Sequence, residues 1–172
     1  MRLQSSLLAI VKLTRQKTGS PKGFTLIELI IVVAMIAILA VIIYVAVDPV
    51  RRIHSSNNAT RAANVNAILN AYLNYIADNK GGTPFGTSAA TRYMIGTGAG
   101  AGSCTAAATS AHLDMSVGLV DRYIASIPKD PVNGTDSDTL YYFYRSSTDR
   151  VTIGACGPEA EGGTTPEIIV TR

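Results

Sequence analysis

The sequence predicts an α+β fold, in which a long N-terminal helical spine packs, along its second half, against a small C-terminal antiparallel sheet. Three observations predict this fold. An apolar run without a charged residue extends from Leu29 to Val47. A helical pattern of apolar residues follows it, and three β-prone segments lie near the end of the chain. The 172 residues allow one modest domain with appendages.

Charge is distributed unevenly along the chain. Residues 1–23 carry five basic side chains and no acid, whereas residues 24–172 carry 10 basic and 12 acidic side chains, a net charge of −2. The basic character therefore belongs to the N-terminal arm. Nucleic-acid binding would need a basic face on the folded part, so we expect no nucleic acid among the partners. A role in DNA uptake would need a local basic patch, for instance around Arg145 and Arg150.

Residues 24–47 are predicted to form a membrane-spanning helix. About 20 residues from Ile27 to Val47 would span about 30 Å, the thickness of the hydrocarbon core of a bilayer. The rest of the chain is too small and polar to wrap such a helix as a buried core. The run is also too long for a secretory signal peptide, and no small-residue cleavage site follows it.

The positive-inside rule places the basic leader, residues 1–23, in the cytoplasm and the residues after Asp48 outside. Arg51 and Arg52 weaken this prediction without reversing it. We therefore expect a single-pass membrane protein whose head lies outside the cytoplasm.

One acid, Glu28, lies inside the apolar segment. A carboxylate at membrane depth costs on the order of 3 kcal/mol and usually has a partner. In a membrane-resident monomer it can stay wet near the headgroups. Alternatively, cleavage between Gly23 and Phe24 would create an α-amino group on Phe24. That cation could pair with Glu28 of a neighbouring subunit and fix the axial register of packed helices.

The stretch KGFTLIELIIVVAMIAILAVI closely resembles the N-terminus of prepilins and pseudopilins, the subunits of type IV pili and type II secretion systems. The matching residues are a basic leader ending in Gly23, then Phe24, Thr25, Leu26, Ile27 and Glu28, and then an apolar helix. The resemblance implies that a membrane-embedded prepilin peptidase cuts after Gly23 and that the amine of Phe24 is methylated. It implies that Glu28 acts in assembly and that the helix becomes the core of a surface or periplasmic filament.

The implied partners are further copies of the chain in a helical polymer, the prepilin peptidase, minor pilins and the assembly platform of a pilus or secretion system. The alternative is a single-pass anchored binding module or enzyme that is neither cleaved nor polymerised. The resemblance does not separate a pilus subunit from a pseudopilin. Many Gram-negative pilins have a proline within the anchoring helix, whereas here the first break is Asp48-Pro49.

An outer amphipathic helix is predicted within residues 48–82. Asp48 suits the N-cap and Pro49 the first helical position, and Gly81-Gly82 ends the helix. The apolar stripe is expected to consist of Ile53, Ala62, Val65, Ile68, Leu69, Tyr72 and Ile76. The opposite, solvent-facing side is expected to carry Arg61, Asn66, Asn70 and Asn74.

Residues 83–172 are predicted to form a small α+β head with a variable loop. Residues 83–112 are interpreted as a surface loop, because the glycines at 97–103 lack the lysine and spacing of a phosphate-binding loop. A short helix is expected within 114–125. Strands are expected at 140–145, 151–156 and 167–172. The stretch IPKDPVNG before YYFYR also resembles the C-terminal region of major pseudopilins.

Two cysteines in an exported domain favour one disulfide between Cys104 and Cys156, although two buried free thiols are the alternative. The bridge would close a loop of about 50 residues and contribute roughly 4 kcal/mol in the chain-entropy model.

No cofactor is expected, with calcium as the one candidate. Four oxygen-bearing side chains in nine residues form a plausible calcium loop: Asp130, Asn133, Asp136 and Asp138. Many major pseudopilins, which the chain resembles, bind Ca²⁺ after the Asp-Pro turn. However, GACGPEAEGG at 154–163 matches their later ligand segment only partly. A solvated turn that uses Asn and Asp for backbone hydrogen bonds is the alternative.

Catalysis has little support. His54 and His112 stand alone without metal-ligand spacing, and no Gly-x-Ser-x-Gly motif occurs. The sequence therefore predicts a structural protein rather than an enzyme.

Overall fold

The computed structural model describes residues 23–83 and 85–172. Except for Gly23, the predicted leader lies outside these residues. The chain divides into two compact units, the first of which ends at Ala46 and the second of which comprises Val47–Arg172. The second unit includes both the predicted outer helix and the predicted head, because this helix and the sheet share one core.

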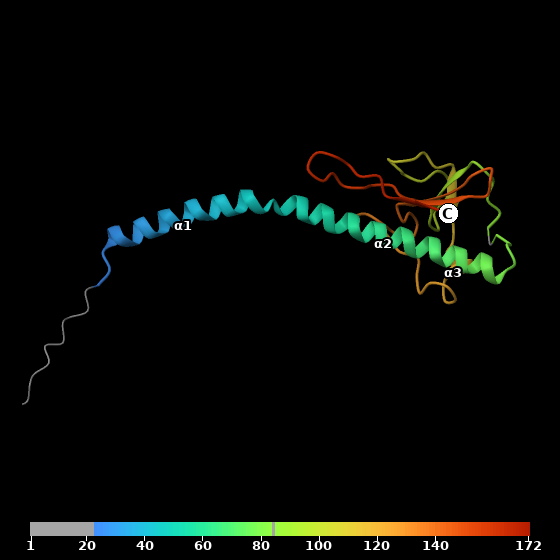
Figure 1. Cartoon of the computed structure of the whole chain (residues 1–172), viewed down its shortest axis with the longest axis horizontal. Coiled ribbons are helices and arrows are strands. Elements are labelled where there is room, and N and C mark those ends of the chain that lie inside the picture. The colour runs from blue at the N-terminus through green and yellow to red at the C-terminus, as the bar shows by residue number, and fades with distance from the viewer. Residues whose placement is uncertain (1–22, 84) are drawn as a thin grey trace, which may run out of the picture. The chain divides into compact units, whose positions relative to one another are not determined.

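The first unit contains nearly all of α1 (Leu26–Val47), drawn in blue in Figure 1. No residue of α1 is buried. By length and composition the helix is apolar and long enough to cross a membrane. The predicted helix is confirmed, although Val and Ile, which favour strands, dominate its sequence. In lipid a helix is favoured because it satisfies its own backbone hydrogen bonds.

A break separates α1 from α2 (Pro49–Asp78) at the predicted position. Asp48 has a left-handed backbone with φ 42°, and its Oδ1 accepts a hydrogen bond from the Arg51 backbone N–H at 3.2 Å. Pro49 fills the first helical position, where its missing N–H costs nothing. After Asp78 the N–H of Gly81 donates to the carbonyl of Ile76 at 2.9 Å, and Gly81 takes φ 87°.

The second unit contains a five-stranded sheet of β1 (Arg92–Ile95), β2 (Ala111–Leu113), β3 (Tyr141–Arg145), β4 (Val151–Ala155) and β5 (Ile169–Thr171). The strand order is β2-β1-β3-β4-β5. All neighbouring strands are antiparallel except β1 and β2, which pair in parallel. The α+β, pilin-like fold is confirmed, but the sheet is mixed rather than purely antiparallel.

Two further expectations were wrong. Residues 83–112 form more than a surface loop, since they contain β1 and the first two residues of β2. The helix expected within 114–125 shrinks to α3 (Ser116–Leu119), a single turn. The N–H groups of Leu119 and Val120 donate to the carbonyls of Met115 and Ser116. A wider turn follows, in which the N–H groups of Tyr123 and Ile124 both donate to the Leu119 carbonyl.

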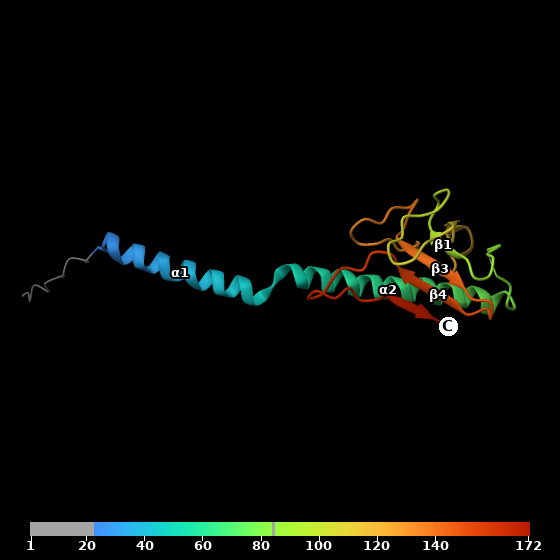
Figure 2. The same ribbon diagram turned by 90° about the horizontal axis from the view of Figure 1, so that it is seen from above.

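The sheet uses its two faces differently. On one face, Phe143 and Ile153 pack with Val65, Ile68 and Tyr72 of α2 in the main core. The Tyr72 and Phe143 rings meet edge to face at 5.2 Å. Figure 2 shows β3 and β4 beside α2. On the other face a second, smaller cluster contains Met94, Tyr142 and Cys156.

Candidate processing and assembly site

The start of α1 is held by Thr25 and Glu28. The Thr25 backbone N–H donates to Glu28 Oε2 at 2.8 Å, and the Thr25 hydroxyl donates to the same oxygen at 2.9 Å. The Glu28 backbone N–H lies 3.2 Å from Thr25 Oγ1. This arrangement is a capping box, in which each residue satisfies a donor that the first helical turn leaves free.

Glu28 therefore has a partner within its own chain, which the sequence interpretation missed. The signal was the Thr-x-x-Glu spacing at 25–28, which is that of a capping box. Among the described residues, only Oε2 of the carboxylate accepts hydrogen bonds. Oε1 remains open to a donor from another molecule.

Gly23 and Phe24 lie in a non-helical segment just before the helix. Phe24 is 94% exposed, and a Cβ placed on Gly23 would meet no atom within 4 Å. Among the described residues, none packs on this segment so as to bury the bond between Gly23 and Phe24. Cleavage after Gly23 and methylation of Phe24 stay predictions.

The surface of α1 is apolar on every side. Its large apolar side chains are between 43% and 75% exposed, from Val47 to Leu26. A continuous apolar surface of this extent marks a site of contact with lipid or with other protein. No residue of the described chain covers it.

The second unit contains a buried polar network that sequence reasoning also missed. Arg61 was expected on the solvent side of the outer helix, but it is only 2% exposed. Its Nε donates to Asp130 Oδ2 at 2.6 Å and its Nη2 to Asp130 Oδ1 at 3.1 Å. The signal was the spacing of Arg61 from Val65 and Ile68, four and seven residues on, which places it on the apolar stripe.

The same network fastens the loop between β4 and β5 to the first half of α2. Arg61 Nη1 donates to Glu159 Oε2 at 3.0 Å. Asn57 and Asn58 donate to the side chain and backbone of Glu159, and His54 Nδ1 lies 2.8 Å from the Ala160 carbonyl. Because side chains of α2 reach both loops, the helix holds the 128–134 turn and the β4–β5 loop at once.

The network shifts the pKa values of its carboxylates. Burial opposes ionisation of Asp130, but hydrogen bonds from Arg61 and from the N–H groups of Val132 and Asn133 outweigh it, so its pKa is lowered. Burial likewise opposes ionisation of Glu159, but hydrogen bonds from Asn57 and Arg61 lower its pKa. Both groups are therefore charged at neutral pH, and they stabilise the Arg61 cation.

The four candidate calcium ligands are not brought together as a set. The carboxylate of Asp130 is turned inward to Arg61. Asp136 Oδ1 lies 3.0 Å from Lys129 Nζ. Asn133 and Asp138 line one cleft of about 380 Å³, together with Ser103 and Thr135. Within 23–83 and 85–172 no three His, Cys, Asp or Glu side chains form a metal-binding group.

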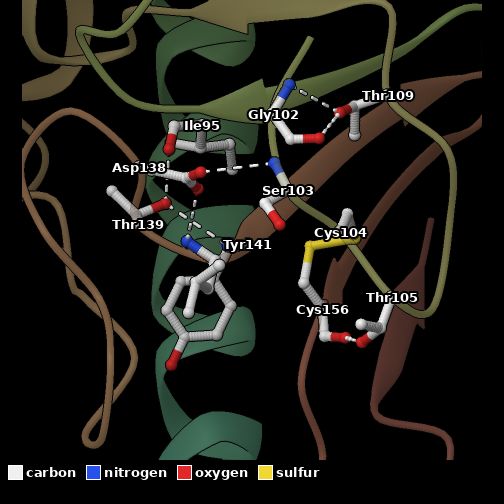
Figure 3. The surroundings of a disulfide bond; sticks show 11 residues. Ile95, Gly102, Ser103, Cys104, Thr105, Thr109, Asp138, Thr139, Tyr141 and Cys156 are labelled. Atoms are coloured by element: carbon white, nitrogen blue, oxygen red, sulfur yellow. Dashed lines mark hydrogen bonds between the residues drawn. A yellow bond between two sulfur atoms is a disulfide. The ribbon is translucent and has the colours of Figure 1, made fainter.

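Cys104 and Cys156 are joined by a disulfide, the pairing that the sequence favours. Figure 3 shows the bridge beside Thr105, whose hydroxyl donates to the Cys156 carbonyl. Asp138 Oδ2 accepts from the Ser103 N–H at 3.3 Å in the same region. A Cβ on Gly102 would lie 2.5 Å from Met94 Cβ. Gly102 thus lies tightly against the sheet face that carries Met94 and Tyr142.

A family model for the prokaryotic N-terminal methylation motif matches residues 20–44. No curated protein and no solved structure matches the chain significantly. The match covers the end of the basic leader, the Gly23–Phe24 junction, the capping box and most of α1. With its pilin-like α+β fold, the chain thus carries the class III signal peptide of type IV pilins and pseudopilins.

Proposed function

We propose that this protein is a structural subunit of a type IV pilus or of a type II secretion pseudopilus, processed after Gly23 by a prepilin peptidase and polymerised through its N-terminal helix. One observation carries the proposal. The helix that contains most of the methylation motif exposes apolar side chains on all sides, and no residue within 23–83 or 85–172 covers it. Such a helix needs lipid around it before assembly and other helices around it in the filament.

Burial of α1 would supply the driving force for polymerisation once the helix leaves the membrane. Apolar area removed from water contributes about 25 cal/mol per Å². A lipid-to-filament transfer gains less, because lipid is already apolar, so an ATP-driven assembly machine is part of the proposal. The further partners are minor pilins and the assembly platform.

Glu28 would set the axial register of the polymer. Its Oε2 is bound to Thr25, and the open Oε1 is suited to accept a hydrogen bond from the Phe24 amine of a neighbouring subunit. An unpaired charge in the filament core would cost several kcal/mol. Subunits would therefore pack in the register that brings the two charges together.

Calcium binding by the loop stays a prediction, now centred on Asn133 and Asp138. These residues share one cleft with Thr135 and Ser103, and all four carry oxygen ligands of the kind that Ca²⁺ prefers. The proposal leaves out Asp130, because its carboxylate forms an ion pair with Arg61. Calcium at this loop would assign the chain to the pseudopilins within the proposed class.

Mass spectrometry of the N-terminal peptide, on protein from the native envelope, tests the proposal. The expected peptide begins at Phe24 and carries one extra methyl group. Gly23→Val should leave a chain that begins at Met1, whereas the control Gly157→Val should still begin at Phe24. A Cβ meets no atom within 4 Å at either glycine, so the first carbon of each new side chain has room. A wild-type chain beginning at Met1, in cells with active peptidase, would make this an uncleaved anchored module.

A further inference from the structure

Two arginines lie just outside the apolar span, at positions that the positive-inside rule disfavours. Arg51 and Arg52 follow the apolar span by four and five residues, on the side that the rest of the chain assigns to the exterior. Basic residues within about 15–20 residues of a span favour the cytoplasmic side. Their presence outside therefore opposes the orientation of the chain, and the function proposed above does not use them.

Both arginines are exposed, and each guanidinium group has N–H donors that make no hydrogen bond with a described residue. Arg52 Nε donates to the carbonyl of Val47 at 3.0 Å, and this is its one side-chain hydrogen bond within the described residues. The Arg51 guanidinium lies beside Gly162, where a Cβ would come within 3.4 Å of its Cζ. It makes no hydrogen bond or ion pair with any described residue. Since each guanidinium has five N–H donors, most of them are free.

The contact with Val47 fixes the level of Arg52 relative to the membrane. Val47 is the last residue of α1, so a guanidinium nitrogen within hydrogen-bond distance of its carbonyl lies at the end of the span. The polar headgroup layer begins at this level and extends roughly 5–8 Å outward. Arg51 is the next residue toward the span and lies in the same helical turn of α2.

Other residues near this level also suit the membrane surface. Tyr44, in the last turn of α1, is 68% exposed, and Tyr is enriched where the hydrocarbon meets the headgroups. Val50 and Ile53, which flank the arginines, are 55% and 58% exposed. The nearby Asp48 carboxylate is committed to capping α2.

We propose that Arg51 and Arg52 bind the phosphate groups of phospholipids in the outer leaflet and thereby anchor the membrane-resident subunit at a fixed depth. Phosphate oxygens match the planar fork of a guanidinium group, which binds them through two parallel hydrogen bonds. The inference rests on the membrane-resident stage of the proposed function. It gives the two outer arginines a ligand at the level where they lie.

The test measures contact between arginine and lipid phosphorus directly. The full chain, labelled with ¹³C at arginine Cζ, is reconstituted into bilayers of phosphatidylglycerol and phosphatidylethanolamine. Solid-state NMR then records the loss of arginine Cζ signal caused by dipolar coupling to ³¹P. The double variant R51Q/R52Q should lose part of this phosphorus-dependent signal. The control R122Q/R150Q, which removes two other exposed arginines, should keep it at the wild-type level.

Equal phosphorus-dependent signal in R51Q/R52Q and in the wild type would overturn the inference. An alkaline carbonate wash of the same bilayers separates this result from failure of the proposed function. If the wild type stays in the membrane but the signals are equal, lipid anchoring by Arg51 and Arg52 is wrong and the proposed function stands. If carbonate releases the wild type, the membrane-resident stage is wrong and the inference falls with it.

Discussion

Arg61 and Asp130 form a two-pronged ion pair whose side chains are each only 2% exposed. The pair joins the middle of α2 to the Asp-Pro turn before β3. Asp130 Oδ1 also accepts from the backbone N–H of Val132 at 2.9 Å and of Asn133 at 3.2 Å. One carboxylate therefore shapes the turn and fastens it to the helix.

Removing one member of this pair should strongly destabilise the second unit. Arg61→Leu leaves the Asp130 carboxylate buried without a cation, which costs about 3–5 kcal/mol. Asp130→Asn should cost less, because Arg61 keeps its second partner, Glu159, at 3.0 Å. The double variant should lose less than the sum of the single variants, because it leaves no such charge. Urea unfolding of residues 47–172, followed by circular dichroism, measures these differences.

The exposed pair Lys129–Asp136 is the matched control. Its atoms lie 3.0 Å apart, but the side chains are 45% and 85% exposed. Lys129→Leu or Asp136→Asn should change the free energy of unfolding by no more than about 1 kcal/mol. Equal losses at the two pairs would contradict the structural importance of burial at Arg61.

Acid should destabilise the wild type more than Asp130→Asn. The pKa of Asp130 is lowered in the folded state, so its contribution to stability is complete above its ordinary pKa of about 4 and is lost as pH falls through the folded value. Glu159 acts in the same direction. Urea midpoints measured from about pH 6 to pH 2 should fall more steeply for the wild type. Parallel curves would show that Asp130 titrates normally in the folded state.

Gly154 in β4 should tolerate no side chain. A Cβ at this position would lie under 3.0 Å from the Tyr142 ring, which crosses the glycine from β3. Forcing an extra methyl group into such a contact costs about 1–3 kcal/mol. Gly154→Ala should show this loss in urea unfolding, whereas Gly157→Ala, which meets no neighbour, should unfold almost as the wild type does. An unchanged Gly154→Ala would mean that the Tyr142 ring moves aside freely.

Calcium should raise the thermal midpoint of the second unit if the cleft at Asn133 and Asp138 holds the ion, because a ligand that binds only the folded state stabilises it. Asp138→Asn should weaken this response and Asp136→Asn should not, since Asp136 does not line the cleft. Differential scanning calorimetry with calcium and with a chelator measures the shift. No shift in the wild type would leave the solvated turn as the correct interpretation.

Local signals predicted much of the fold. The uncharged run, the Asp48-Pro49 break and the β-prone segment around Tyr141–Arg145 each follow from a short window of sequence, and each appears where it was expected. The strands β1 and β2 could not be predicted in this way. They have only four and three residues in a stretch rich in Gly, Ala and Thr. β1 pairs with β3 and β2 pairs with β1, and this pairing stabilises them more than their own propensity does.

The buried network was harder to predict, because a charge is normally expected on the surface. Arg61 lies on the apolar stripe by spacing, but its partners are 69 and 98 residues away. Only the folded chain brings Asp130 and Glu159 to it. The same holds for Asp130, whose composition-based interpretation as a calcium ligand ignored a cation from a distant helix.

Glu28→Gln should separate the two roles of Glu28. Glutamine at this position also closes a capping box with Thr25, so the start of α1 should survive. It carries no charge, however, and cannot neutralise the amine of a neighbouring Phe24. We therefore expect the variant to insert into the membrane and to be processed normally, but to be absent from the sheared filament fraction. Thr25→Ser, which keeps both the cap and the acid, is the control and should assemble. Wild-type amounts of filament from Glu28→Gln would show that Glu28 acts only as a capping residue and that the register of the polymer is set by apolar packing alone.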